Sequence, residues 1–147
     1  SADNKSRESI PFLQIDEQES NDQTKAVNYL IQKGIKNIGI VGATGKREDH
    51  TLGNISLLIE YQRMGINAIM ATDNGVFFPC KDEVCIKSYK GQQVSIFNIS
   101  GSHFSSNNLV YPLPDLLDMW WQGTLNEAKE NAFSIEAEGE YLIFLNY

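Results

Sequence analysis

The fold is decided by NDQTKAVNYLIQKGIKNIGIVGATGKREDHTLGNISLLIEYQRMGINAIMATD, residues 21–73. Apolar residues recur at helical spacing in its first part, which predicts a helix over about 22–33. IKNIGIVGA (35–43) is a short apolar run bounded by glycine, which is typical of a buried strand in a parallel sheet. The same signals predict a second helix over about 50–63 and a second strand, INAIMATD, at 66–73. This order predicts an α/β unit with parallel strands.

Beyond residue 73 the pattern changes. Asn74-Gly75 is a strong turn signal, and short runs of β-type residues follow it: VFFP, EVCIKSY, QQVSIFNI, NLVY, FSIEAEG and EYLIFLNY. They predict an all-β unit of about six to eight strands, a sandwich or a barrel, in which the last two runs form a terminal hairpin. We therefore divide the chain into an α/β unit, residues 1–73, and an all-β unit, residues 74–147. Upstream, IPFLQI (10–15) is a further candidate strand.

The composition of the chain argues against several classes of partner and location. The chain has 147 residues, of which 41% are hydrophobic, as expected for a globular protein of one domain or two small ones. A net charge of -7 argues against nucleic acid and anionic membrane surfaces as partners. No apolar run approaches the roughly 20 residues that a spanning helix needs. The polar first residues show no signal peptide, so a cytoplasmic location is expected.

The two cysteines, Cys80 and Cys85, are separated by four residues. A zinc site needs four ligands, or three and a water, and neither cysteine has a histidine nearby. We therefore expect two reduced thiols around a β-turn. With only two histidines in the chain, a histidine-rich metal site is excluded.

The loop GATGKREDHTLGN (42–54) joins the end of a predicted parallel strand to a helix. Ligands bind to α/β sheets at such ends, and helix N-terminal amides favour phosphate. Arg47 can bind phosphate oxygens with two donors, and Asp49 can hold Mg²⁺, accept a proton from a hydroxyl or orient Arg47. Alternatively, Asp49 only caps the helix and Arg47 is a solvated charge. The loop is not a Walker A phosphate loop, because it lacks that motif's spacing.

A second polar cluster, EQESNDQTK (17–25), lies at the start of the first predicted helix. Glu17, Glu19 and Asp22 place negative charge where the helix dipole stabilises it. The cluster is either simple capping or a carboxylate directed at Mg²⁺ or a substrate hydroxyl.

Together the clusters resemble the signature of the bacterial thiamine pyrophosphokinase family. Arg47, Asp49, His50 and Asn54 match its Arg-x-Asp-His-x-x-x-Asn motif, with Lys46 where the family usually has glycine.

Upstream, the family has an acidic stretch that ends in Thr-Asp and continues with Lys-Ala. Gln18, Asp22 and Lys25 are in register with it, and Asn21 replaces the usual threonine.

Downstream, NLVYPL (108–113) resembles the family's Gly-Leu-Lys-aromatic-Pro-Leu segment, with Tyr111 as the aromatic residue and Asn108 replacing the glycine. GTLNEA (123–128) resembles its Ser-Asn-Glu motif, with Leu125 replacing the serine. The resemblance covers nearly the whole chain from about residue 15 onward.

The resemblance implies a transferase that moves pyrophosphate from ATP to the hydroxyethyl group of thiamine, giving thiamine diphosphate and AMP. It implies that 1–73 is the C-terminal part of a Rossmann-like, ATP-binding catalytic domain. Residues 74–147 would be a β-sandwich for thiamine binding and dimerisation. Mg²⁺ would be held by carboxylates. Each thiamine site would lie between the α/β part of one subunit and the β-sandwich of the other in a homodimer.

The resemblance also implies roles for single residues. The catalytic set would be Asp22, Arg47 and Asp49, with Asp22 also binding the metal. The substrate-binding set would be Gln18, Lys25, His50, Thr51, Asn54, Ser105, Ser106, Tyr111 and Asn126, with Tyr111 stacked on a thiamine ring. Trp120 and Trp121 would lie in a strand before GTLNE, one in the core and the other at the dimer interface.

Family members begin with a further α/β stretch that carries Ala-Asp-Gly-Gly and Gly-Asp-x-Asp-Ser, and neither motif occurs here. We therefore expect the chain to lack the N-terminal part of the catalytic domain and to show no turnover alone. Two other interpretations stay open: a non-enzymatic module that binds thiamine or a nucleotide and regulates a partner, and a structural α+β domain whose acidic residues cap helices.

Overall fold

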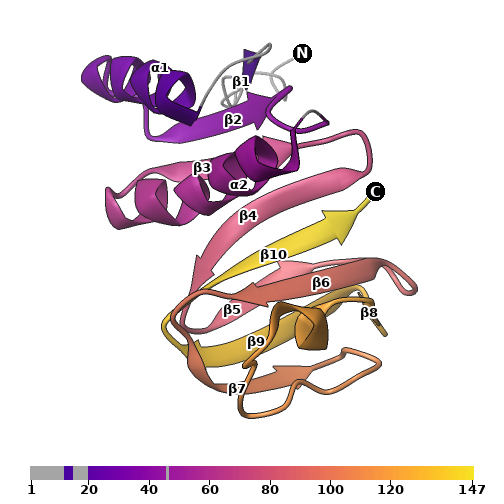
Figure 1. The fold of residues 1–147 in the computed structure, drawn as a ribbon. Coiled ribbons are helices and arrows are strands. Elements are labelled where there is room, and N and C mark those ends of the chain that lie inside the picture. Colours follow the sequence, from indigo (N-terminus) through magenta and orange to yellow (C-terminus); the bar gives the residue numbers. More distant parts are fainter. Residues whose placement is uncertain (1–11, 15–19, 46) are drawn as a thin grey trace, which may run out of the picture.

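The computed structural model describes residues 12–14, 20–45 and 47–147. Its main element is a mixed seven-stranded sheet in the order β1-β2-β3-β4-β10-β6-β8 (Figure 1). These strands are β1 Phe12–Gln14, β2 Asn37–Val41, β3 Asn67–Ala71, β4 Gly75–Lys81, β10 Glu140–Asn146, β6 Gln93–Asn98 and β8 Asn126–Glu127. A second, three-stranded sheet has the order β5-β9-β7, from Val84–Lys87, Ala132–Glu138 and Ser102–Asn107. The helices are α1 Ser20–Gln32, α2 Glu48–Arg63 and the short 3-10 helix η2 Trp120–Gly123.

The predicted helix, strand, helix and strand of the first unit are confirmed as α1, β2, α2 and β3. β1, β2 and β3 are parallel, with Leu13 opposite Ile40 and Ile40 opposite Met70. The α2 side chains Leu58 and Tyr61 are fully buried in the core that also contains Ile40 and Met70. Among the described residues, neither helix has the length and apolar character needed to cross a membrane.

No gap in the sheet separates the two predicted units. β4 pairs antiparallel with β3, with Met70 opposite Phe77, and pairs antiparallel with β10 along its whole length. The sequence change near residue 73 therefore marks the point where strand pairing changes from parallel to antiparallel. Thr72 closes the turn there, because its Oγ1 accepts hydrogen bonds from the amides of Asn74 and Gly75, both at 3.2 Å.

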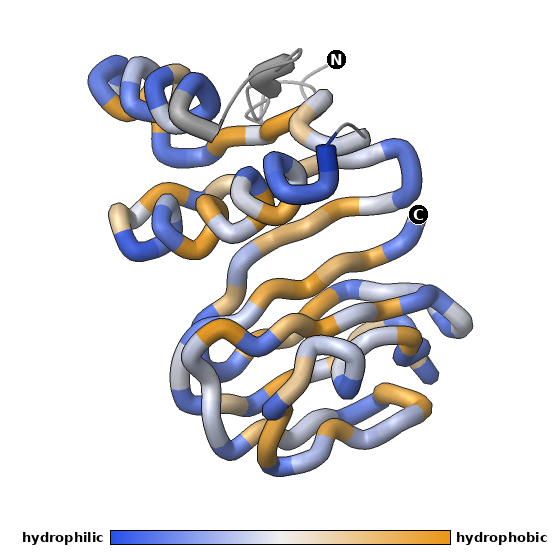
Figure 2. The backbone as a smooth tube through the Cα atoms, viewed as in Figure 1, coloured by the Kyte–Doolittle hydropathy of each residue, from blue (hydrophilic) through white to orange (hydrophobic). Residues whose placement is uncertain are grey.

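The predicted terminal hairpin is wrong. β9 and β10 follow one another in sequence, but β9 pairs with β5 and β7 whereas β10 pairs with β4 and β6. The chain changes sheet at Gly139, whose φ of +118° is in the region that favours glycine. Phe133 and Ile135 of β9 then share a core with Tyr141 and Ile143 of β10. Figure 2 shows apolar residues along the strands of both sheets and on the helices beside the main sheet.

Two further segments differ from expectation. NLVY (108–111) was expected to be a strand but forms only an isolated bridge, between Leu109 and Ala128. SHFSSN, which the sequence did not indicate, forms β7. Its small polar residues give no hydrophobic alternation, and only Phe104 is buried in the core.

An ion pair fastens the end of α2 to the start of β10. Arg63 donates from Nε to Glu140 Oε2 at 2.8 Å and from Nη2 to Oε1 at 2.6 Å. Ser100 Oγ also donates to Glu140 Oε1, at 3.0 Å. The hydrogen bond from Arg63 lowers the pKa of the Glu140 carboxyl, so this group is charged at neutral pH. The pair joins the helical layer to a strand of the antiparallel part.

The β4–β10 contact is a sensitive test of this fold. A Cβ atom on Gly75 would collide with the Leu145 carbonyl and the Phe144 ring. We expect Gly75→Ala to lower the free energy of unfolding by about 3 kcal/mol or more, because backbone atoms cannot move away cheaply. Gly53→Ala is the matched control: α2 leaves open space there, so alanine should stabilise by about 0.5–1 kcal/mol. Urea denaturation measures both, and equal stability of the two variants would contradict the β4–β10 pairing.

Candidate functional site

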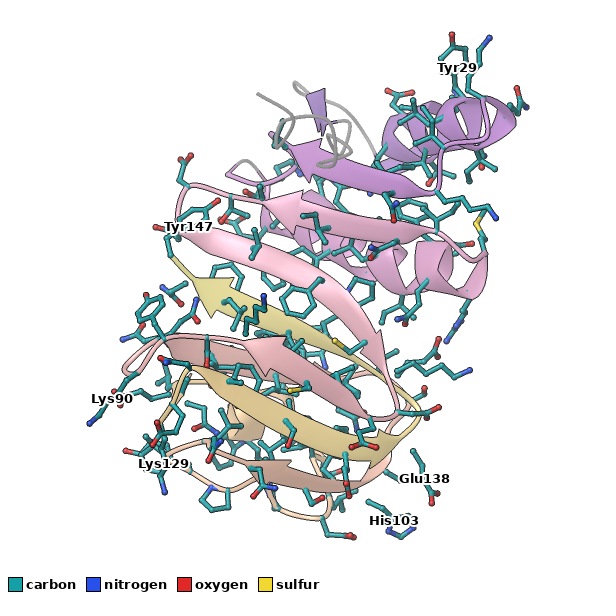
Figure 3. All side chains as sticks on the ribbon, turned by 180° about the vertical axis from the view of Figure 1, so that it is seen from behind. Tyr29, Lys90, His103, Lys129, Glu138 and Tyr147 are labelled. Atoms are coloured by element: carbon teal, nitrogen blue, oxygen red, sulfur yellow. The ribbon has the colours of Figure 1, made fainter. Side chains whose placement is uncertain are left out.

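An open cleft of about 680 Å³ lies at the carboxyl ends of β2 and β3. Its walls come from both halves of the chain: Val41, Gly42, Thr44, Gly45, Thr51, Ile55, Ala71, Thr72, Asp73, Asn74, Phe77, Phe144 and Tyr147. Figure 3 shows Tyr147 at the end of β10, beside the turn between β3 and β4. Its hydroxyl donates to the Thr72 carbonyl at 2.9 Å. The cleft is therefore at the edge where α/β sheets bind ligands, beside the first turn of α2.

Arg47 and Asp49 contact each other at the start of α2. Arg47 donates from Nε to Asp49 Oδ1 at 3.2 Å and from Nη2 to Oδ2 at 2.7 Å. Asp49 Oδ1 also accepts the amide of His50 at 2.9 Å. The Arg47 hydrogen bond is the main cause that lowers the pKa of the Asp49 carboxyl. Since α2 begins at Glu48 with Arg47 in the capping position, the alternative that Asp49 is the N-cap is wrong.

The upstream cluster is only partly described. Asp22 lies in the first turn of α1, and Lys25 Nζ is 3.8 Å from its Oδ1. Because α1 begins at Ser20, both Asn21 and Asp22 lie inside its first turn. Gln18, like Glu17 and Glu19, falls outside the described residues.

Carboxylates that could hold Mg²⁺ are dispersed in the described part of the chain. Within the described ranges, no group of three histidine, cysteine, aspartate or glutamate side chains is close enough to hold a metal ion. Asp22 faces Lys25, and Asp49 faces Arg47. Within the described ranges, these carboxylates therefore do not make a complete Mg²⁺ site.

Asn54 supports the loop above α2. It is 3% exposed, its Nδ2 donates to the Ala43 carbonyl at 3.1 Å, and its backbone carbonyl accepts a hydrogen bond from Gln23 Nε2 at 3.3 Å. It therefore fastens the loop after β2, and also α1, to α2. Two other residues that were predicted to bind substrate lie at the start of α2. Thr51 lines the cleft, and His50 is half-buried in the first turn of the helix.

A second pocket, of about 480 Å³, surrounds Tyr111. It is lined by Tyr111, Pro112, Leu113, Pro114, Trp121, Gln122, Thr124, Leu125 and Asn126. Asn126 is buried and holds the Tyr111 backbone from both sides: Oδ1 accepts the Tyr111 amide at 3.1 Å and Nδ2 donates to its carbonyl at 2.7 Å. Ser106 Oγ accepts the Leu113 amide at 2.9 Å, whereas Ser105 is exposed on β7. Asn126 and Ser106 thus position the segment that carries Tyr111.

The prediction that Trp120 and Trp121 lie in a strand is wrong. They form the first half of η2, with exposed fractions of 49% and 71%. A 3-10 helix turns about 120° per residue, so neighbouring side chains need not face opposite sides. Trp120 meets Phe97 edge-on, with ring centroids 5.9 Å apart, and donates Nε1 to the Asn98 carbonyl at 3.0 Å. Trp121 borders the Tyr111 pocket.

The sequence indicates only part of the residues that line the cleft and the Tyr111 pocket. Phe77, Phe144 and Tyr147 reach the cleft only because β4 and β10 continue the sheet, and no local pattern reveals that. For the Tyr111 pocket, the motifs NLVYPL and GTLNEA contain most of the lining residues, but neither motif places Trp121 beside Tyr111. The expected thiols are present: Cys80 and Cys85 are both free, and burial raises the pKa of the Cys80 thiol to about 12.

Two family models match the chain in succession. Residues 2–70 match the model described as "Thiamin pyrophosphokinase, catalytic domain", and residues 75–144 match "Thiamin pyrophosphokinase, substrate-binding domain". Together they cover most of the chain, which therefore belongs to the thiamin pyrophosphokinase family. No curated protein matches the sequence.

Solved structures share the fold. Thiamine pyrophosphokinase from Bacillus subtilis is 22% identical over 85% of this chain, with a TM-score of 0.73. A family protein from Enterococcus faecalis is 18% identical over 86%, with a TM-score of 0.74, and the Candida albicans enzyme is 16% identical over 84%, with a TM-score of 0.63. The chain spans 62%, 63% and 51% of these three chains, respectively.

The Asn126 contacts predict a stability effect. Asn126→Ala leaves the Tyr111 amide and carbonyl without their side-chain partner, and we expect a loss of about 2 kcal/mol in the free energy of unfolding. Asn107→Ala, at an exposed position on β7, should change stability by less than about 0.5 kcal/mol. Thermal denaturation measures both; similar small effects at the two positions would show that Asn126 does not hold this segment.

Proposed function

We propose that the protein is a thiamine diphosphokinase, which transfers pyrophosphate from ATP to the thiamine hydroxyl and releases AMP. The observation that carries the proposal is the succession of the two family domains, with the Arg47–Asp49 pair at the start of α2, beside the cleft that both halves line. In this proposal residues 1–73 are the C-terminal part of a Rossmann-like, ATP-binding catalytic domain. Residues 74–147 are a β-sandwich that binds thiamine and mediates dimerisation.

The geometry favours one of the three roles considered for Asp49. Arg47 uses Nε and Nη2 to bind this carboxylate, so its remaining N–H donors are free for phosphate oxygens. A carboxylate whose pKa is already lowered is a weak proton acceptor. Asp49 therefore acts mainly by orienting Arg47, which then stabilises charge on the transferred phosphates.

Mg²⁺ enters the proposal through family resemblance. The ion would neutralise phosphate charge, and Asp22 would be one of its carboxylate ligands. The other members of the upstream set, Gln18 and Lys25, would contact the substrate, as would His50 and Thr51 at the start of α2.

Thiamine is proposed to bind at Tyr111. Thiamine is a flat cation, and the exposed face of a tyrosine ring attracts such a group. Ser105, Ser106 and Asn126 are the candidate polar contacts with thiamine. Ser106 and Asn126 also bind backbone groups of the segment that carries Tyr111.

The separation of the cleft from the Tyr111 pocket supports a homodimer. The cleft beside α2 and the Tyr111 pocket have no lining residue in common. A two-fold dimer that brings the Tyr111 pocket of one subunit to the cleft of the other would complete both sites. Sedimentation at micromolar concentration tests this, and a clean monomer would contradict it.

A non-enzymatic module that binds thiamine or a nucleotide is the other class considered. The match of residues 2–70 to a catalytic domain favours the enzyme. An AMP-release assay on the full-length protein with thiamine, ATP and Mg²⁺ separates the two, since a binding module releases no AMP.

The Arg47–Asp49 pair gives the sharpest mutational test. Arg47→Ala in the full-length protein should lower turnover by about two orders of magnitude or more, because the transferred phosphates lose a fixed cation. Asp49→Asn should abolish most activity with nearly unchanged Tm, since the site is exposed. Lys87→Ala removes the same charge from an exposed position on β5 and should leave turnover unchanged. Activity retained in Asp49→Asn would reject the role of Asp49.

A further inference from the structure

Leu125 combines two unfavourable features. Its φ is +59°, in the left-handed region that leucine rarely occupies. Its side chain is 82% exposed, more than that of any other large hydrophobic residue in the described part of the chain. Neither hydrophobic core of the described residues includes it. Such strain is typical of residues in functional sites, so the conformation of Leu125 points to a contact outside its own chain.

Leu125 stands on the rim of the Tyr111 pocket. Tyr111 and Trp121, with exposed fractions of 63% and 71%, line the same pocket. Three large apolar side chains thus surround one open space.

The backbone beneath these side chains is firmly held. Asn126 binds both backbone groups of Tyr111, and Thr124 donates from Oγ1 to the Trp121 carbonyl at 2.7 Å. The Leu125 amide lies 3.4 Å from Ser95 Oγ on β6. Binding a ring here would therefore order few backbone groups, which favours affinity.

We propose that Leu125 is a specificity-determining residue that packs against the edge of the thiamine ring bound at Tyr111. The inference rests on the proposed function and names a contact that the function does not require. The pocket lies within the segment that matches the substrate-binding domain. Aromatic faces at Tyr111 and Trp121 suit a flat cation.

Leu125 adds a contact of a different kind. Its methyl groups offer only apolar contact, so they favour a ring edge that carries carbon and disfavour one that carries unpaired polar groups. A serine at this position, as the family motif has, would offer a hydroxyl instead. Leu125 therefore selects for rings with an apolar edge, while the Tyr111 ring provides the face on which the bound ring stacks.

Thiamine titration monitored by tryptophan fluorescence tests the inference, because the only two tryptophans are Trp120 and Trp121. The test variant is Leu125→Asn in the full-length protein, since asparagine adopts left-handed φ values readily. We expect thiamine affinity to fall about tenfold, as for loss of a buried leucine contact, while Tm stays equal or rises.

Leu116→Asn is the matched control, because Leu116 is also exposed but does not line the pocket. It should leave thiamine affinity unchanged. Leu125→Met keeps a long apolar side chain at this position, so its thiamine affinity should be within about twofold of that of the unsubstituted protein. If Leu125→Asn lowers Tm, the thiamine affinities of Leu125→Met and Leu125→Ser are compared instead, provided that these two variants have equal Tm. The serine variant should then bind thiamine more weakly than the methionine variant.

The outcomes separate the inference from the proposed function. If the unsubstituted protein binds no thiamine, the proposed function and this inference both fail. If it binds thiamine, Tyr111→Ala weakens binding and Leu125→Asn does not, only the role of Leu125 is overturned. A change of oligomeric state in Leu125→Asn with unchanged thiamine affinity would also overturn it, because the leucine would then contact a second copy of the chain.

Discussion

The antiparallel pairing of β3 with β4 is the constraint on which the rest of the structure depends. It joins three parallel strands to four antiparallel ones, so that one sheet runs through both halves of the chain. Because β10 pairs with β4, Phe144 and Tyr147 reach the cleft at the ends of β2 and β3. The Arg63–Glu140 ion pair fastens the far end of α2 to the same strand. The cleft is therefore a product of both halves and not of the α/β part alone.

Polar residues in the two pockets divide into those that support the backbone and those that are free to meet a ligand. Asn54 and Asn126 are nearly fully buried, and their amides bind the carbonyl of Ala43 and the backbone of Tyr111. Arg47 and Tyr111 are largely exposed, and each is held by a neighbour, Asp49 in one case and Asn126 in the other. An exposed group on a rigid support is the arrangement that binding sites need.

Local periodicity was sufficient for α1, α2, β2 and β3, because each element has its own apolar pattern. It was insufficient where the partner decides the outcome. β9 and β10 follow one another in sequence as hairpin strands do, but their pairing with different sheets depends on contacts distant in sequence. Similarly, the family resemblance predicts that Asn54 and Asn126 bind substrate, and only the structure shows that their side-chain amides bind backbone groups of the chain. Leu125 was noted as a departure from the family pattern, yet its left-handed φ has no sequence signal.

A comparison of two unfolding probes tests most directly whether the continuous sheet makes the halves one unit. The α-helices of the described residues, α1 and α2, lie in the first half, and both tryptophans lie in the second. Far-UV circular dichroism at 222 nm therefore reports mainly on the first half and tryptophan fluorescence on the second. If β3–β4 pairing couples the halves, the two thermal transitions superimpose with the same Tm. Two separate transitions, with helix lost before or after the tryptophan change, would contradict the account.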